Sequence, residues 1–149
     1  MTETQTQQEF ISSDDKLLSL VSHLSACLGG ILVPIIIYFI QKDKSKYVAY
    51  NALSAILWQL IYILIILILS FGFIFIGVLI PTLSVATKSA EAPVVFIIFV
   101  ISICAVIIGL VIFFLGYAIW AAIKSYQGEL IKYPFIGNFA YKNVYGKNI

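Results

Sequence analysis

The chain has 149 residues, a net charge of +2 and an apolar content of 62%, but its charged residues are distributed very unevenly. Three stretches contain no Asp, Glu, Lys or Arg: residues 17–41, 47–87 and 92–123, together 98 of the 149 residues. About 20 apolar residues cross the hydrocarbon core of a bilayer, so each stretch predicts at least one crossing. The remaining residues form two tails and two short connections, which excludes a soluble enzyme and a folded aqueous domain.

The N-terminal tail, residues 1–16, is acidic and precedes the first predicted crossing at about 17–40. It has four acidic residues and one lysine, so it lacks the basic n-region of a cleaved signal peptide, and we expect the first apolar stretch to remain in the mature chain. Ser12, Ser13 or Asp14 can cap the first helix, because their side chains accept hydrogen bonds from its unpaired amides.

The second and third predicted crossings lie at about 51–80 and 93–123. Pro81 is expected to end the second helix, because proline lacks an amide hydrogen. Pro93 suits the first turn of the third. The sequence therefore predicts an all-α polytopic membrane protein, in which a bundle of three transmembrane helices forms a membrane domain over residues 17–127.

The distribution of lysines favours three crossings over four. Three crossings place seven of the nine lysines on one side of the membrane, whereas a hairpin within the middle stretch would give four crossings and divide the lysines four to five. Because cytoplasmic loops carry the excess of lysine and arginine, we expect an inner-membrane protein with its N-terminus outside and its C-terminus in the cytoplasm. A bundle of four helices remains the alternative.

Small and polar residues mark the helix faces that we expect to pack, since close approach and hydrogen bonds drive association in lipid. At 100° per residue they gather on one side of each predicted helix. They are Ser19, Ser22, His23, Ala26, Gly30 and Pro34 in the first helix, Asn51, Ala55 and Gln59 in the second, and Ser102, Gly109 and Gly116 in the third. The third set repeats every seven residues, which favours a left-handed seam with a helix of the same chain or of another subunit.

His23 is the only histidine and a functional candidate, because titratable groups inside membranes are usually functional. A relay or metal site needs partners, and no acidic residue or second histidine lies in any predicted crossing. We therefore expect a neutral His23 bonded to a serine or a backbone carbonyl; proton sensing, substrate contact and metal binding are the alternatives. No hydrolase motif is present, so the sequence predicts a protein that is not an enzyme and has no metal or cofactor.

The C-terminal tail, residues 128–149, mixes aromatic rings with lysines. That mixture favours the headgroup layer of a membrane, so we expect the tail to lie on the cytoplasmic surface; a solvated tail that orders on a partner is the alternative. The residues expected at the interface are Tyr133, Pro134, Phe135, Phe139 and Tyr141.

Three segments carry a resemblance to a known family. Residues 20–29 read LVSHLSACLG, residues 42–59 read KDKSKYVAYNALSAILWQ, and residues 121–137 read AAIKSYQGELIKYPFIG. They resemble a family of small prokaryotic membrane proteins, largely of unknown function, that is similar to the chloroplast Tic protein-import component. The chain departs from that pattern at Asn51, where histidine is frequent, and at Ser54, where glutamine is common. The resemblance implies a part in protein translocation, insertion or export.

Two functions are compatible with the sequence. The first is a non-enzymatic integral membrane subunit that packs with other membrane proteins or with itself, accessory to a translocation, insertion or export complex. The second is a self-assembling channel or small transporter with a polar path near His23, Asn51 and Gln59. Both have the lipid bilayer as a partner and neither involves nucleic acid. The sequence leaves open the partner, the oligomeric state, any substrate and whether His23 titrates.

Overall fold

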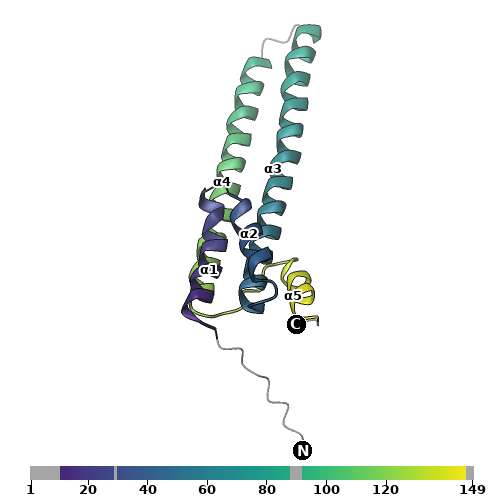
Figure 1. Ribbon diagram of the computed structural model, residues 1–149. Coiled ribbons are helices and arrows are strands. Elements are labelled where there is room, and N and C mark those ends of the chain that lie inside the picture. Colours follow the sequence, from purple (N-terminus) through teal and green to yellow (C-terminus); the bar gives the residue numbers. More distant parts are fainter. Residues whose placement is uncertain (1–10, 29, 88–91, 147–149) are drawn as a thin grey trace, which may run out of the picture. The chain divides into compact units, whose positions relative to one another are not determined.

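The described residues of this computed structural model, 11–28, 30–87 and 92–146, form an all-helical protein (Figure 1). Its elements are α1 (Ser13–Leu24), the 3₁₀ helix η1 (Ser25–Leu28), α2 (Leu32–Gln41), α3 (Lys46–Thr87), α4 (Ala92–Tyr126) and α5 (Gly137–Tyr145). They divide into two compact units. The first unit comprises Met1–Leu57 and Ala118–Ile149, and the second comprises Trp58–Tyr117. Helices α3 and α4 each contribute residues to both units.

Helix α1 begins with a capping box formed by Ser12 and Asp15. The Asp15 amide donates to the Ser12 hydroxyl oxygen at 3.1 Å, and the Ser12 amide donates to the Asp15 carboxylate at 3.0 Å. Two amides without helical partners are thereby satisfied reciprocally. Ser12, one of the three residues expected to cap this helix, is the N-cap.

The first predicted crossing, 17–40, is not one continuous helix. The chain leaves α1 through η1, where the Ser25 hydroxyl donates to the Ser22 carbonyl at 2.7 Å and the Gly30 amide donates to the Ser25 carbonyl at 3.1 Å. Pro34 then lies in the first turn of α2, where its missing amide hydrogen costs no helical bond. A new helix begins two residues before Pro34, so the proline interrupts no helix here.

Helices α1 and α2 are too short to cross a bilayer. They have 12 and 10 residues, which at 1.5 Å per residue give about 18 Å and 15 Å against a hydrocarbon core of ~30 Å. They pack against each other as a hairpin within the first unit (Figure 1). A tight turn follows α2, and the Ser45 hydroxyl accepts the Val48 amide at 3.3 Å at the start of α3.

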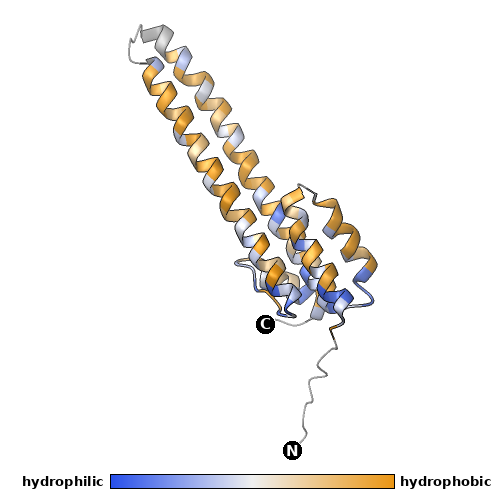
Figure 2. Cartoon of the chain, turned by 90° about the vertical axis from the view of Figure 1, so that its left-hand side faces the viewer, coloured by the Kyte–Doolittle hydropathy of each residue, from blue (hydrophilic) through white to orange (hydrophobic). Residues whose placement is uncertain are grey.

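Only α3 and α4 are long and apolar enough to span a membrane among the described residues. The candidate spans are Lys46–Leu83 and Pro93–Tyr126. Most residues of both helices in the second unit are hydrophobic (Figure 2). The protein is therefore an all-α membrane protein with two candidate spans, and the predicted bundle of three is not what the helices show.

Aromatic contacts align α3 and α4 as an antiparallel hairpin in the second unit. Trp58 lies against Phe114 with ring centroids 4.7 Å apart, and its indole N–H donates to the Phe114 carbonyl at 3.4 Å. Farther along, Phe73 stacks on Phe99 at 5.8 Å. From the first pair to the second, the residue number rises by 15 on α3 and falls by 15 on α4. The two helices therefore run antiparallel.

Pro81 does not end α3, contrary to the sequence prediction. The helix continues to Thr87, with Pro81 inside it. In this turn the Thr82 hydroxyl lies 3.0 Å from the Val78 carbonyl oxygen and 2.8 Å from that of Leu79. The Thr82 hydroxyl thus adds hydrogen bonds to the helical turn that holds the proline.

Helix α4 ends in a Schellman motif at Gly128, which has φ +90°. The Gly128 amide donates to the Ser125 carbonyl at 3.0 Å, and the Glu129 amide donates to the Lys124 carbonyl at 3.1 Å. The carboxylate of Glu129 also pairs with the Lys124 ammonium at 2.8 Å. The helix therefore ends at this glycine, and the chain continues within the first unit.

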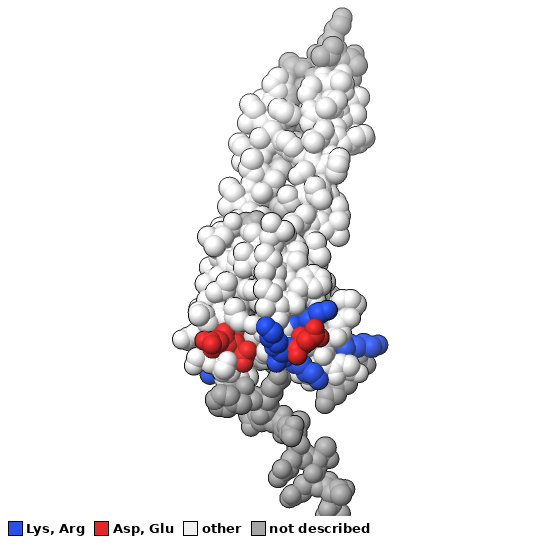
Figure 3. Space-filling view, in the orientation of Figure 1, with Lys and Arg blue, Asp and Glu red and all other residues white. Residues whose placement is uncertain are grey.

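Every charged residue that the structure describes belongs to the first unit, where acidic and basic groups gather together (Figure 3). Lys16, near the start of α1, lies close to the end of α4: its Cε is 3.5 Å from the position that a Cβ on Gly128 would occupy. The lysine count assumed that residues 17–40 cross the bilayer as one helix, whereas this stretch holds two helices that are each too short to do so.

Candidate functional site

A buried histidine joins three separate segments of the first unit. His23 on α1 is 1% exposed, and its ring contacts Asn51 on α3 and Tyr133 in the segment after α4. The Nε2 to Asn51 Oδ1 distance is 3.2 Å, and the Nδ1 to Tyr133 Oη distance is 2.9 Å. Tyr133 is itself 3% exposed. The three side chains thus tie α1, α3 and the C-terminal segment into one core.

The hydrogen bonds define the protonation state of His23. Asn51 donates through Nδ2 to the Tyr47 carbonyl at 3.0 Å, so its Oδ1 is the atom that faces the histidine. An amide oxygen only accepts, which makes Nε2 the protonated nitrogen and leaves Nδ1 to accept from the Tyr133 hydroxyl. A neutral imidazole satisfies both contacts.

The partners of His23 differ from those expected from the sequence. A serine or backbone carbonyl was predicted, whereas the structure supplies an asparagine and a tyrosine. Asn51 was expected on the packing face of the second helix and in the alternative polar path near His23, but not as its hydrogen-bond partner. Tyr133 had been assigned to an interfacial tail, although its alternation with buried Ile131 is a signal for a segment packed along one side.

Burial lowers the pKa of His23 to about 4, from its ordinary value of 6.5, and α1 lies outside both candidate spans. The unfolded chain then binds a proton more readily than the folded one, so stability is complete above pH 6.5 and declines as the pH falls toward 4. We expect the first unit to lose about 2 kcal/mol of stability at pH 5 relative to pH 7.5. Thermal unfolding in detergent at the two pH values measures this.

The matched variant for this prediction is His23→Gln, which has no titratable ring. Its stability is expected to change much less between pH 7.5 and pH 5 than that of the unmodified chain. Equal pH dependence in the two proteins would show that a group other than His23 titrates.

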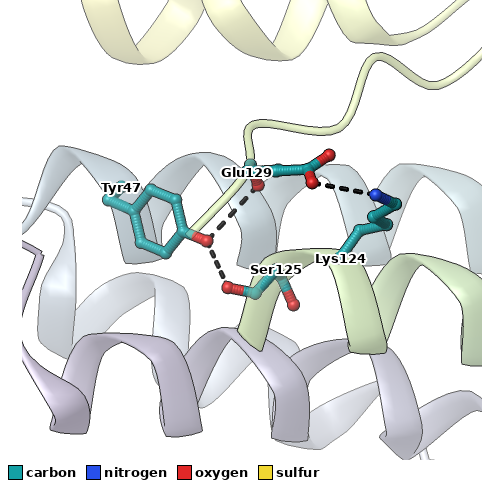
Figure 4. A network of polar contacts seen from close by, with 4 residues as sticks. All are labelled: Tyr47, Lys124, Ser125 and Glu129. Carbon is teal, nitrogen blue, oxygen red and sulfur yellow. Dashed lines mark hydrogen bonds and ion pairs between the residues drawn. The ribbon is translucent and has the colours of Figure 1, made fainter. Parts of the chain in front are cut away.

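Tyr47 ties the first turn of α3 to the end of α4 (Figure 4). Its hydroxyl donates to the Ser125 carbonyl and lies 3.3 Å from the Glu129 carbonyl oxygen. The Ser125 carbonyl also accepts the Gly128 amide, so the Tyr47 hydroxyl adds a second hydrogen bond there and links the end of α4 to α3. The Tyr47 ring also packs with Ile37, Val48 and Ala52 in a hydrophobic cluster.

A second tyrosine, Tyr50, holds the C-terminal segment and α5. Its hydroxyl donates to the Ile131 carbonyl at 2.6 Å, and its ring meets Tyr141 edge-on at 5.9 Å. Tyr141 stacks on Tyr145 at 4.4 Å, and the Lys46 ammonium lies 6.0 Å from the Tyr145 ring. The tail is therefore a folded part of the first unit, in which Tyr133 is buried and Tyr141 is half-buried.

The other residues singled out from the sequence take two kinds of position. Ser19, Ser22, Pro34, Ala55 and Gln59 are buried, and Ala26 and Gly30 are half-buried. The hydroxyls of Ser19 and Ser54 have no hydrogen-bond partner among the described residues, so these small side chains serve close packing. Ser102, Gly109 and Gly116 are exposed, and a Cβ at either glycine would meet nothing within 4 Å. The seven-residue seam therefore faces away from α3.

A family model for the magnetosome magnetite crystal formation proteins, MamF/MmsF, matches residues 14–140. The chain belongs to this family. The match extends from the first turn of α1 into α5 and so includes both units. Neither a search of curated proteins nor a search of solved structures finds a match.

The family match corrects the resemblance to the Tic import component. The segments around His23, Asn51 and Tyr133 that suggested it all lie within the matched range. Short motifs set in hydrophobic sequence match unrelated membrane proteins readily, and the three segments were too short to separate the two families. Neither the Tic-like assignment nor the role in protein transport that it implied is retained.

Proposed function

We propose that the chain is a non-enzymatic membrane subunit that acts in magnetite crystal formation by packing with other membrane proteins. Its family supports the process, because the match covers 127 of 149 residues. The side chains of His23, Asn51 and Tyr47 are engaged in hydrogen bonds that hold helices together, which fits a structural role better than a chemical one. A channel through these residues gains no support from that arrangement.

We also propose a topology for this subunit, with both tails on the cytoplasmic side and the α3–α4 connection on the other. The seven lysines of the described residues all belong to the first unit, which contains the start of α3 and the end of α4. An excess of lysine marks the cytoplasmic side. The connection after Thr87 then faces the periplasm, or the lumen of a vesicle formed from the inner membrane.

The observation that carries the packing role is the outward face of α4. Ser102, Gly109 and Gly116 lie on it at a spacing of seven residues, and α3 does not cover them. Small residues at this spacing allow a second helix to approach closely, and the contact gains van der Waals energy that lipid cannot match. The partner proposed for this face is another membrane helix.

Gly109→Leu and Gly116→Leu are therefore expected to reduce cross-linking to a partner helix in native membranes by roughly tenfold, because a leucine side chain blocks close approach. Gly72→Leu on α3 is the matched control, since a Cβ there also meets nothing within 4 Å. It should leave cross-linking unchanged. Equal cross-linking in all three variants would contradict the assignment of this face.

The role in crystal formation has a direct test in the source cell. Deleting the gene is expected to change the number or size of magnetite crystals seen by electron microscopy. The unmodified chain should restore them, and the double variant Gly109→Leu with Gly116→Leu should not. Unchanged crystals after the deletion would overturn the proposed process, whereas restoration by the double variant would overturn only the packing face.

A further inference from the structure

Phe135 occupies an unusual position in the turn before α5. Its side chain is 98% exposed, and its backbone has φ +66°, in the left-handed region. That region costs a residue with a side chain about 1–2 kcal/mol. Exposure of the apolar ring to water is a second unfavourable contribution to the free energy. This second cost is removed if another surface covers the ring.

The turn is held rigidly on both sides of Phe135. Ile131 and Tyr133 are buried, and the Gly137 amide donates to the Tyr133 carbonyl at 3.0 Å. A Cβ on Gly137 would lie 3.2 Å from the Cα of Lys132, so the backbone closes tightly there. Because Tyr133 also donates to His23, the first unit fixes the conformation that exposes the Phe135 ring.

The exposed surface around this turn is both apolar and basic. Phe139 is 58% exposed and Leu130 is 41% exposed, while the Lys132 and Lys142 side chains are also exposed. Among the described residues, the first unit carries seven lysines and four acidic residues, an excess of three positive charges. Aromatic rings beside lysines suit the boundary between acyl chains and headgroups, and the charge suits anionic phosphates.

The turn lies close in the chain to the end of the candidate span in α4. The candidate span ends at Tyr126, nine residues before Phe135, and nine residues extend at most ~30 Å. We propose that the turn is an interfacial anchor: the Phe135 ring enters the lipid layer at headgroup depth, and Lys132 and Lys142 bind anionic phospholipid. This inference does not depend on the role in crystal formation.

Site-directed fluorescence tests the position of the ring. In the full chain with Cys27→Ser and Cys104→Ala, Phe135→Cys is labelled with an environment-sensitive dye and reconstituted into liposomes of phosphatidylcholine with phosphatidylglycerol. Lys44→Cys, in the exposed polar turn before α3, is the matched control. Iodide should quench the dye at position 135 roughly fivefold less than at position 44, as for a side chain at an interface. Equal quenching would overturn the proposal.

A second set of variants tests the lipid without a label. Phe135→Gly removes the ring but suits the positive φ, so the fold is expected to persist. Added phosphatidylglycerol should raise the melting temperature of the unmodified protein in detergent. This shift in melting temperature should fall by at least half in two variants: Phe135→Gly and the double variant Lys132→Gln with Lys142→Gln. It should not fall in the control variant Lys44→Gln. An unchanged shift in the first two, or protection of position 135 only when another protein is present, would overturn the lipid assignment.

Discussion

Replacing His23 with alanine is expected to lower the free energy of unfolding of the first unit by about 3–5 kcal/mol. The substitution leaves a cavity at a fully buried position, and it removes the partner of both Asn51 Oδ1 and the Tyr133 hydroxyl. A buried polar atom that loses its hydrogen-bond partner costs more than the hydrogen bond itself contributes. Hydrogen–deuterium exchange of α1 amides in detergent measures the loss locally.

Leu28→Ala is the control for His23→Ala, because Leu28 lies in the adjacent 3₁₀ helix and is 86% exposed. Its exchange rates should match those of the unmodified chain. Combining His23→Ala with Tyr133→Phe should cost less than the sum of the two single changes, since both changes remove the same hydrogen bond. Additive losses would show that the two side chains do not interact.

Tyr47→Ala is expected to have an effect of similar size, about 3–5 kcal/mol, because a large buried aromatic ring is lost from the core. The ring is 2% exposed and packs with Ile37, Val48 and Ala52. Its hydroxyl also donates to the Ser125 carbonyl at the end of α4. We expect faster amide exchange both at the start of α3 and at the end of α4, although these segments lie 78 residues apart in the chain.

Tyr47→Phe separates packing from hydrogen bonding at this position. The ring remains and only the hydroxyl is lost, so we expect a cost of about 1–2 kcal/mol, with faster exchange confined to the end of α4. If Tyr47→Phe were as damaging as Tyr47→Ala, the hydrogen bond rather than the ring would dominate. If neither variant changed exchange at the end of α4, the contact between Tyr47 and Ser125 would be contradicted.

The two long helices could be predicted from the sequence, and the first crossing could not. Charge-free stretches located α3 and α4 to within a few residues at most ends, because apolar length is a direct consequence of bilayer thickness. The stretch at 17–41 passes the same test, yet it contains a turn. Gly30 and Pro34 were visible there, but composition does not distinguish a kinked helix from two short helices.

Prediction of the buried polar core around His23 also required knowing that residues 17–41 form two short helices rather than one. Helical periodicity grouped Ser19, Ser22 and His23 on one side of their helix, and the structure buries all three. Their partners come from other segments, and Tyr133 is 110 residues from His23. Periodicity reports which face of a helix is inside but carries no information about which distant residue meets it. The partners of His23 depend on how α1 packs against α3 and the C-terminal segment.

The topology of the two-span arrangement has a direct measurement, based on single cysteines in a chain with Cys27→Ser and Cys104→Ala. Cysteines at positions 4, 84 and 143 are exposed to a membrane-impermeant maleimide before and after cell lysis. Positions 4 and 143 are expected to react only after lysis. Position 84 should react in intact spheroplasts if it faces the periplasm, and only after detergent is added if it faces a vesicle lumen. Reaction of positions 4 and 143 from opposite sides would contradict the two-span fold and restore a third crossing.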